Sequence, residues 1–382
     1  MRFLAALLVE ILRASHYVSS DDDSLFDLSP DEKDIENEWV RNLIPTHSVS
    51  PLPFLQSKFE RVDASYSAIQ TIQLGVRIAR TRTSSVFHIV RRPEDVIKYQ
   101  IDCDPNPFHT LAKEFAVLKL ISDLEIAPKP KLLSEARAVG KLGESAKTQF
   151  TMDSEEWRNC KQPLVRYLVM TRTGATLFDV LRDSGRQSVE WGVRMLISVI
   201  KGLQQLHQRR IVHGDVHQGN VAFKNVNGAQ DGFVLIDFEF AKIVPQGHEL
   251  EDVEVEKPTI PHPMHTPWVL QGYPISFRDD LYRALETFAI AIAGNQLYEE
   301  LTSIIGRMSV ELAYQLKSAG YLFKKACVIA AVPMKLREVL EEVRIYIQQL
   351  DMHELPNHER LIQNLIDSMG IQTNPSGHSG AI

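Results

Sequence analysis

Three oxygen-bearing side chains in the middle of the chain have the types and the order that phosphoryl transfer requires. Asp215 and Asn220 lie five residues apart in the loop-like run 211–220, and Asp237 follows the apolar run 234–236. Phosphoryl transfer needs a carboxylate that orients or accepts the proton of the attacking hydroxyl, and oxygen ligands that hold Mg²⁺ on the phosphates. Together these three side chains could meet both requirements.

A helix, a glycine-containing loop and a short hairpin are expected to bring these side chains together. Apolar residues recur at helical spacing from 193 to 207, directly before the loop, which predicts an amphipathic helix. Strand-like runs follow at 221–224 and 233–236, with an Asn-Gly turn between them. The alternative is that these polar residues only stabilise turns, with Asp237 capping the next segment. Their joint occurrence in this order favours the chemical interpretation.

The remaining chain predicts strands first and helices afterwards. Strand-like runs occur at 85–90, 95–100 and 166–170, and one amphipathic helix is expected at 111–121. Helices resume from residue 279 to about 350. The order predicts an α+β protein with a small β-rich N-lobe and a larger, mainly helical C-lobe. Such a layout is compatible with a nucleotide held between lobes.

Polar segments are expected on both sides of this globular region. The stretch after residue 18 is acidic and rich in serine, which is typical of a linker or a loosely packed extension. Glycine, serine and asparagine dominate the C-terminal end, which predicts a flexible tail. The expected boundaries are 1–18 for a signal peptide or N-terminal helix, 19–65 for the acidic extension, 66–352 for the globular domain with lobes at 66–170 and 175–352, and 353–382 for the tail.

Composition limits the classes of partner and the cellular compartment. A net charge of −7 argues against a general nucleic-acid binder. Three cysteines without a CxxC spacing support neither a disulfide framework nor a thiolate zinc site. The first residues form an apolar run that Glu10 and Arg13 interrupt, so a secretory signal and an amphipathic helix both fit. Cytoplasmic and secreted locations both stay open, and no membrane span is expected.

The loop and strand motifs resemble those of the protein kinase superfamily over about residues 70–350. That family has a catalytic loop of the form His-Arg-Asp-x-Lys-x-x-Asn and a metal motif Asp-Phe-Gly, which correspond to the runs around Asp215 and Asp237. The resemblance implies a bilobal protein-kinase-like fold that uses ATP and Mg²⁺. It further implies that Asp215 is the catalytic base and that Asn220 and Asp237 bind magnesium.

The same resemblance assigns residues in the expected N-lobe. Lys98 matches the lysine that grips the α- and β-phosphates, and Glu114 on the following helix matches its ion-pair partner. Met170 would border the adenine and Val86 would cover it. The nucleotide-covering loop of the family normally carries three glycines, whose bare backbone lets amides approach phosphate. The corresponding positions here hold Ala79, Thr81 and Ser84.

The sequence resembles two branches of the protein kinase superfamily in different motifs. The run 276–281 and the hinge-like run 169–177 resemble casein kinase I-type enzymes, so Asp280 is expected to accept backbone N–H groups of the catalytic loop. His217 in place of the usual lysine, next to glycine and asparagine, resembles aminoglycoside and choline phosphotransferases. Gly214 replaces the usual arginine, which predicts activity without phosphorylation of the activation segment.

Three hypotheses follow for the function. The favoured one is a serine/threonine protein kinase-like enzyme that transfers the γ-phosphate of ATP to a hydroxyl. A small-alcohol phosphotransferase would use the same residues, and a pseudokinase scaffold would explain the missing glycines. ATP and a protein or small-alcohol substrate are the expected partners, and the oligomeric state stays open. His262 and His265 are expected to face solvent, and a zinc-protease reading of His353 and His358 fails because a proline separates them.

Overall fold

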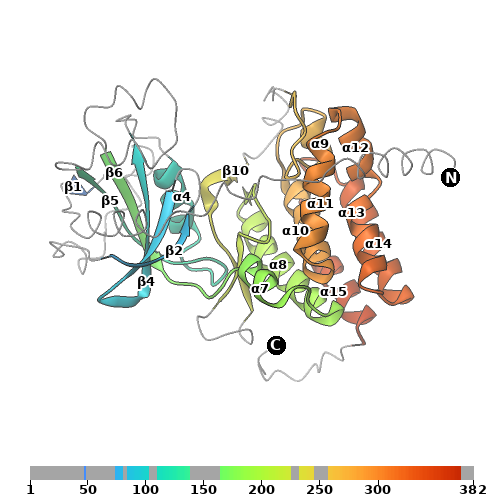
Figure 1. Ribbon diagram of the computed structural model, residues 1–382, viewed down its shortest axis with the longest axis horizontal. Coiled ribbons are helices and arrows are strands. Elements are labelled where there is room, and N and C mark those ends of the chain that lie inside the picture. The colour runs from blue at the N-terminus through green and yellow to red at the C-terminus, as the bar shows by residue number, and fades with distance from the viewer. Residues whose placement is uncertain are drawn as a thin grey trace, which may run out of the picture. The chain divides into compact units, whose positions relative to one another are not determined.

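The computed structural model of the protein describes residues 47–48, 74–80, 84–102, 110–137, 164–224, 232–244 and 257–370. These residues fall into two compact units, the sheet unit up to Thr173 and the helical unit from Gly174 onward. The first contains most of the described strands and the second contains most of the helices, as the labels of Figure 1 show. This arrangement confirms the expected α+β class.

Six described strands of the sheet unit form one antiparallel sheet in the order β1-β5-β6-β4-β3-β2. Three of the strands, β3, β4 and β6, confirm the predicted strand-like runs. The alternation of side chains across β3 buries one face, since Phe87 and Ile89 are almost completely buried. The strand bounds are β1 His47–Ser48, β2 Leu74–Arg80, β3 Ser84–Ile89, β4 Arg92–Asp102, β5 Pro130–Arg137 and β6 Leu164–Thr171.

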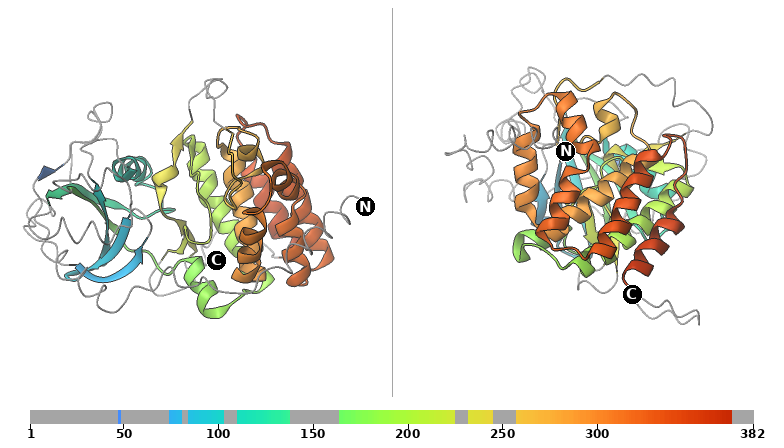
Figure 2. Two further views of the ribbon diagram at one scale, coloured as in Figure 1. Left: turned by 45° about the horizontal axis from the view of Figure 1, so that its top comes forward. Right: turned by 90° about the vertical axis from the view of Figure 1, so that its right-hand side faces the viewer.

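Helix α4 (Thr110–Leu120) packs against strands β5 and β6 of this sheet (Figure 2). Its apolar residues Leu111, Phe115 and Leu118 recur every three or four positions and are buried, which is the pattern of a helix with one face in a core. The sequence predicted this helix within one residue at either end. The helix matters for function because Glu114 lies on it.

The helical unit begins with two helices, which are followed by two small two-stranded sheets. Helices α7 (Leu177–Ser184) and α8 (Val189–Gln208) start at Thr176 and Ser188, whose side chains accept backbone N–H groups of the first turn. After α8, strand β7 (Ile211–Val212) pairs with β10 (Lys242–Ile243), and β8 (Val221–Phe223) pairs with β9 (Phe233–Leu235). The predicted loop therefore lies between β7 and β8, and Asp237 lies between β9 and β10.

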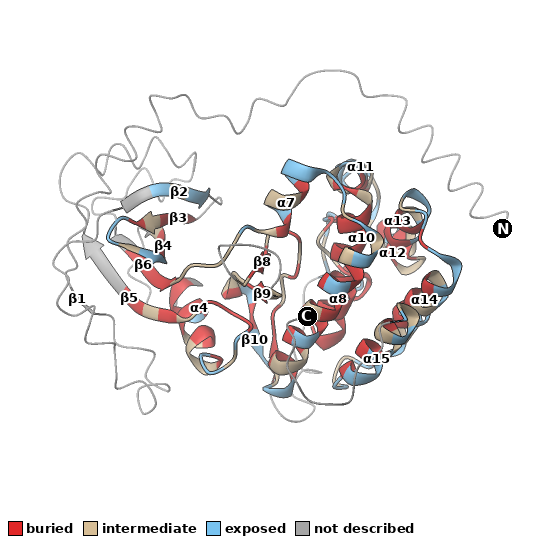
Figure 3. Ribbon diagram, turned by 90° about the horizontal axis from the view of Figure 1, so that it is seen from below, coloured by how far each residue is buried: buried red, intermediate tan, exposed pale blue. Residues whose placement is uncertain are grey.

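Helix α10 (Phe277–Ala293) is the centre of the helical unit. Every residue from Phe277 to Ile292 is buried, and the helix is drawn almost entirely in the colour of buried residues in Figure 3. It contacts α8, α11, α13 and α14, which explains why no face of it is exposed to solvent, and its polar side chains are buried as well. The surrounding helices are α9 (Pro267–Leu270), α11 (Asn295–Ile305), α12 (Val310–Ser318), α13 (Tyr321–Ile329), α14 (Met334–Gln349) and α15 (His358–Ser368).

The C-terminal end differs from the sequence prediction. We expected a flexible tail from residue 353, but residues 358–368 form α15, which packs on α8 and α14. Its apolar side chains Leu361 and Leu365 are buried, so the helix is stabilised by tertiary contacts. The expected signal peptide or helix at 1–18, and the end of the tail beyond residue 370, lie outside the described residues. Within the described part of the chain, no helix is long and apolar enough to cross a membrane.

Candidate active site

Lys98 and Glu114 form a buried ion pair in the sheet unit. Lys98 Nζ lies 2.8 Å from Glu114 Oε2, and the two side chains are 4% and 1% exposed. Lys98 lies on β4 opposite Val86 of β3 and Leu168 of β6, so the sheet fixes its backbone. Removing one member of such a buried pair costs about 3–5 kcal/mol, because the other charge stays buried without compensation. The structure thus contains the expected pair, and the role of Lys98 toward phosphates stays a prediction.

The other predicted nucleotide residues of the sheet unit lie on the β2–β3 hairpin and on β6. Ala79 is exposed and pairs in register with the half-buried Val86, while Ser84 is buried at the start of β3. Met170 is buried near the end of β6. A hairpin therefore forms at the position of the glycine-rich loop without the three glycines. Thr81 lies outside the described residues.

The helical unit brings Asp215 and Asn220 together. The Asn220 side-chain amide donates to Asp215 Oδ2 at 3.0 Å and to the Asp215 carbonyl oxygen at 2.9 Å. Asn220 is 5% exposed and Asp215 is half-buried. The amide nitrogen of Asn220 thus holds the loop closed and fixes the carboxylate of Asp215. The sequence prediction that the two residues point to one place is confirmed.

His217 lies beside the carboxylate of Asp215. Its Nε2 is 3.4 Å from Asp215 Oδ2, and its Nδ1 accepts the backbone N–H of Gly219 at 3.0 Å. A neutral ring therefore carries its proton on Nε2, where it faces Asp215. Burial alone would raise the pKa of Asp215, but the hydrogen bond and charge of His217 outweigh it, and the pKa lies below its ordinary value. Asp215 is thus a carboxylate at neutral pH and can accept a hydrogen bond from a hydroxyl.

Asp237 follows β9 and is joined to the catalytic loop through the backbone. The N–H of Ile236 donates to the carbonyl oxygen of Asn220 at 3.0 Å, and His213 Nε2 donates to the carbonyl oxygen of Ile236 at 3.1 Å. Asp237 has φ 63° and ψ 74°, the left-handed region that non-glycine residues rarely occupy. A strained backbone conformation persists only where the surrounding structure holds it in place, and such residues are concentrated at functional sites.

The residues at this end of the loop are suited to a magnesium ion. Asn220 uses its amide nitrogen for both of its side-chain hydrogen bonds, and within the described residues its side-chain oxygen has no donor. Asp237 supplies a half-buried carboxylate directly after Ile236, whose N–H makes the backbone link to Asn220. Magnesium prefers oxygen ligands and is commonly bound by one or two protein side chains plus phosphate oxygens. The donor set therefore fits the predicted metal.

Asp280 fixes the start of the catalytic loop through hydrogen bonds to its backbone. Its Oδ2 accepts the N–H of His213 at 2.7 Å, and its Oδ1 accepts the N–H of Gly214 at 2.9 Å. His207 Nε2 lies 3.0 Å from Asp280 Oδ2. Asp280 is 1% exposed, and these contacts compensate its burial. The predicted structural role of Asp280 is confirmed.

Comparison with known proteins decides the family. A profile of the fungal protein kinase family matches residues 58–262, more than half of the chain. The chain belongs to the fungal protein kinase family. It is similar to a probable serine/threonine-protein kinase of Corynebacterium efficiens, with 29% identity over 135 residues, 35% of this chain and 20% of that protein. It is also similar to a putative ribosomal protein S6 kinase alpha-2 of Caenorhabditis elegans, with 30% identity over 102 residues, 26% of this chain and 13% of that protein.

The match therefore extends over a fifth or less of the length of these two relatives. The family profile and the retained motifs place the chain among protein-kinase-like proteins, and its activity is the subject of the proposal below. The predicted superfamily is thus confirmed by comparison as well as by fold.

An arginine in place of Gly214 would not fit the conformation that the loop adopts at this position. Gly214 has φ +80°, and a Cβ atom at this position would lie 2.8 Å from the backbone oxygen of Phe240. A contact this short with backbone can be relieved only if the loop or the segment after Asp237 moves. The close approach therefore requires glycine.

Gly185 offers a matched test of this requirement. It has φ +75°, but no atom lies within 4 Å of a Cβ placed there. Gly185→Ala is expected to cost about 1–3 kcal/mol of the free energy of unfolding from the backbone conformation alone, since φ 75° with ψ −119° lies outside the regions that L-residues favour. Gly214→Ala is expected to cost at least about 1 kcal/mol more, since the steric conflict with the backbone of Phe240 adds to the strain of a positive φ. Urea denaturation of both variants measures the difference, and equal losses would contradict the close approach.

The buried histidine His358 extends the anchor of Asp280 to helix α15. His358 Nε2 lies 2.9 Å from His207 Nδ1, and both rings are buried. Burial, and then the neighbouring His207, lower the pKa of His358 to about 3. The sequence considered His358 only as half of a rejected zinc motif, because its partner His207 is 151 residues away in the chain.

This histidine predicts a dependence of stability on pH. The ordinary pKa is 6.5, so below that pH the unfolded chain binds a proton that the folded protein excludes, and stability is lost as the pH falls. His358 should lower the free energy of unfolding by about 1 kcal/mol between pH 7 and pH 5.5. In His358→Gln the decrease should be smaller by this amount. Urea denaturation at the two pH values measures it, and an unchanged decrease would contradict a buried neutral His358.

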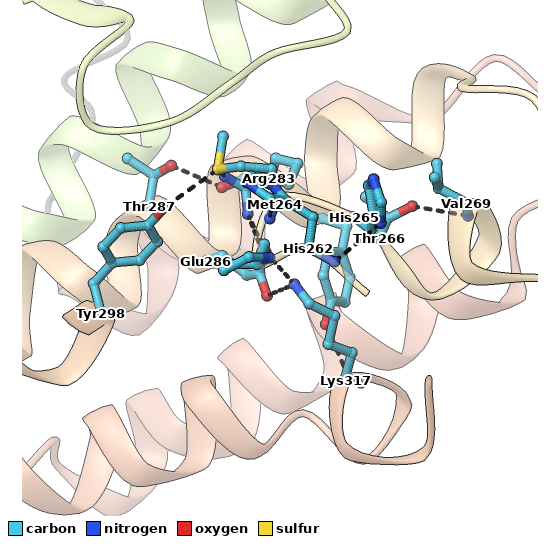
Figure 4. A network of polar contacts seen from close by, with 12 residues as sticks. His262, Met264, His265, Thr266, Val269, Arg283, Glu286, Thr287, Tyr298 and Lys317 are labelled. Atoms are coloured by element: carbon cyan, nitrogen blue, oxygen red, sulfur yellow. Dashed lines mark hydrogen bonds and ion pairs between the residues drawn. The ribbon is translucent and has the colours of Figure 1, made fainter. Parts of the chain in front are cut away.

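A second buried network lies next to the catalytic loop and was missed by the sequence analysis. Glu286 pairs with Arg283 and with Lys317, whose Nζ is 2.9 Å from Glu286 Oε1. Figure 4 shows the side chains of Arg283, Glu286 and Lys317 close together. Arg283 Nε also donates to the carbonyl oxygen of Val216 at 3.2 Å, and Lys317 Nζ donates to that of Pro263 at 2.7 Å. The network thus connects α10 with the loop and with the segment before α9. The sequence signal that could have revealed this network is the presence of Arg283 and Glu286 within the otherwise mainly apolar run 281–292.

A pocket of about 730 Å³ opens beside the catalytic loop, entirely within the helical unit. Asp215 and His217 line one side of it, and His262 and His265 line another. The sequence analysis expected these two histidines to face solvent. His262 is indeed exposed, but His265 is half-buried, and both border the pocket that contains the predicted catalytic base. This correction makes them candidate contacts for an acceptor.

Proposed function

We propose that the protein is an ATP- and Mg²⁺-dependent phosphotransferase that transfers the γ-phosphate of ATP to serine or threonine hydroxyls. The observation that carries the proposal is the arrangement around Asn220. Its side-chain amide fixes Asp215, and its backbone carbonyl pairs with the strand that ends at Asp237. The loop between β7 and β8 is thereby linked to the end of β9, which supports a site that combines Asp215, Asn220 and Asp237, the types of side chain that phosphoryl transfer needs.

Asp215 would orient the attacking hydroxyl and accept its proton. The carboxylate is ionised at neutral pH, since its pKa lies below the ordinary value of 3.8, so it can accept a hydrogen bond from a hydroxyl without first losing a proton. His217 would donate from Nε2, first to Asp215 and, as negative charge moves toward the transferred group, to a phosphoryl oxygen. Asp280 would keep the loop in place through the amides of His213 and Gly214.

Asn220 and Asp237 would hold magnesium, and Lys98 would bind the α- and β-phosphates. When bound, the metal neutralises the charge of the phosphates and orients them toward the acceptor. The protein contributes the fixed positions of its oxygens: the loop bonds hold Asn220, and the end of β9 holds Asp237. The buried Glu114 would keep Lys98 extended from the sheet in one conformation.

A small alcohol is the second candidate acceptor. The pocket beside Asp215 has about 730 Å³, which lies within the range of about 300–1,000 Å³ for small-molecule sites. The run His-Gly-Asp-x-His-x-Gly-Asn points in the same direction. Against it, the chain is similar to a probable serine/threonine-protein kinase and to a putative ribosomal protein S6 kinase. The protein acceptor is therefore the primary proposal.

Transfer of labelled γ-phosphate from ATP tests the proposal. The native protein and Asp237→Ala are incubated with Mg²⁺ or Mn²⁺ and with two panels, mixed proteins and metabolite alcohols. The native protein should label proteins on serine or threonine, and the variant should lose about 100-fold or more of this activity. Labelling of alcohols alone would select the second candidate. Nucleotide binding without any transfer would identify a pseudokinase and reject both.

A further inference from the structure

We infer that the pocket beside Asp215 selects acceptors whose hydroxyl lies next to a bulky, uncharged apolar group. The inference rests on the proposed function, because it names the acceptor of the same site. A serine or threonine with a large apolar neighbour in a peptide is the form of acceptor that suits the pocket. Four features of the pocket support this inference. They are the exposed side chains at its rim, its apolar inner wall, the internal pairing of the charged side chains that line it, and two neutral histidines.

The rim of the pocket carries two exposed phenylalanines. Phe178 on α7 is 43% exposed and Phe240 in the 3₁₀ turn Phe238–Phe240 is 54% exposed, and both line the pocket. Large apolar side chains that stay in water at one concave site are typical of binding surfaces. Covering them with a ligand would remove apolar surface from water, which favours an apolar group on the ligand.

The inner wall is also apolar and is held in a fixed shape. Met264, Val269 and Tyr298 line it. The sulfur of Met264 accepts a hydrogen bond from Arg283 Nη2 at 2.6 Å and one from the Tyr298 hydroxyl at 3.5 Å, as Figure 4 shows. These two contacts fix the otherwise flexible methionine side chain. The wall therefore presents a preformed apolar surface, which lowers the entropic cost of binding.

The charged side chains of α10 that line the pocket have their partners inside the protein. Asp279 accepts hydrogen bonds from the backbone N–H and the hydroxyl of Ser276, each at 2.8 Å. Asp280 is occupied by two backbone N–H groups of the catalytic loop, and Arg283 pairs with Glu286. A charged neighbour of the acceptor hydroxyl would lose its hydration in the pocket without gaining one of these groups as a partner. The pocket thus disfavours charge next to the hydroxyl.

His262 and His265 are neutral donors that suit a peptide backbone. His265 Nδ1 accepts the N–H of His262 at 3.2 Å, and His262 Nδ1 accepts the N–H of Met264 at 3.2 Å. Each neutral ring therefore carries its proton on Nε2, for which the described residues supply no acceptor. Burial lowers the pKa of His265 to about 4 and also lowers that of His262. Two uncharged N–H donors match carbonyl oxygens better than carboxylates.

Peptide affinity, measured separately from transfer, tests the inference. Isothermal titration calorimetry with Mg²⁺ and ADP present compares peptides with one central serine whose two neighbours are leucine, phenylalanine, glutamate or lysine. Leucine and phenylalanine peptides should bind about 10- to 100-fold more tightly than the charged ones. Transfer from ATP to the same peptides, and to aromatic and polyhydroxy alcohols, forms the second arm.

Two variants with matched controls locate the effect in the pocket. Val269→Glu should remove the preference for apolar neighbours and make the lysine peptide the tightest, since it adds a carboxylate to the wall. Val328→Glu makes the same change at a valine that is 68% exposed on α13, away from the pocket, and should leave the preference unchanged. Phe178→Ala should weaken binding of the apolar peptides about 10-fold. Leu355→Ala, at a leucine 46% exposed outside the pocket, should not.

The outcomes separate this inference from the proposed function. Equal affinities for all neighbours, tighter binding of a charged peptide, or no binding of any peptide or aromatic alcohol would overturn the inference even if phosphate is transferred. Apolar preference in binding without any transfer would support the inference and count against the proposed function. Preference for aromatic alcohols with no peptide bound would support the apolar chemistry and replace the peptide by a small molecule.

Discussion

Asp215→Asn is expected to lower phosphoryl transfer by about 10²- to 10⁴-fold, the range that general base catalysis contributes. The variant keeps the size and shape of the side chain. The amide nitrogen of Asn220 and the Nε2 of His217 both approach the same oxygen, Oδ2, so the amide oxygen of the variant can serve both. What disappears is the negative charge and the capacity to accept a proton from the acceptor hydroxyl.

Steady-state transfer at saturating ATP and Mg²⁺ measures this loss, and nucleotide affinity is measured in parallel. Affinity should change by less than about twofold, because the effect lies in the transition state and not in binding of the nucleotide. Asp183→Asn is the matched control, since the Asp183 side chain is 73% exposed on α7, and it should keep full activity. Unchanged turnover in Asp215→Asn would end the assignment of this residue as the base.

Asp280→Asn is expected to cost about 3–5 kcal/mol of the free energy of unfolding, as removal of a buried, fully paired charge does. Asp280 accepts from His213 N, Gly214 N and His207 Nε2 at 2.7–3.0 Å. An amide offers an acceptor on one side only, so its NH₂ group would face one of these donors. A buried N–H group would then be left without an acceptor.

Urea denaturation of the native protein and of Asp280→Asn measures the loss. The same Asp183→Asn control should stay within about 0.5 kcal/mol, because its side chain is exposed. The variant should also lose activity, since the loop that carries Asp215 is no longer anchored at its start. A loss of stability below about 1 kcal/mol would show that other contacts hold the loop.

The sequence predicted the elements whose signals are local. Helix α8 was recognisable from the spacing of its apolar residues, and the hairpin of β8 and β9 from the Asn-Gly pair between its strands. Asp215 and Asn220 were found because they share the loop between α8 and β8, and Asp237 because it follows the apolar run that forms β9. The contact between Asp215 and Asn220 was predictable for the same reason, as five residues of loop keep them close.

The elements that were missed depend on distant partners. Strand β5 contains lysine, proline and glutamate and becomes a strand only by pairing with β6. Helix α15 was taken for a tail because its face of leucine and histidine has meaning only against α8 and α14. The pairing of Glu286 with Arg283 and Lys317 likewise joins two helices. Periodicity predicts that such faces are buried, but it does not name the partner.

A crystal structure with Mg²⁺ and a non-hydrolysable ATP analogue tests the central claim most directly, because the account requires Asn220 and Asp237 to bind one metal. We predict a magnesium ion at about 2.1 Å from a carboxylate oxygen of Asp237 and from the side-chain oxygen of Asn220, with phosphate oxygens completing its shell. A bound nucleotide whose metal touches neither residue, or Asn220 and Asp237 turned away from each other, would contradict the account.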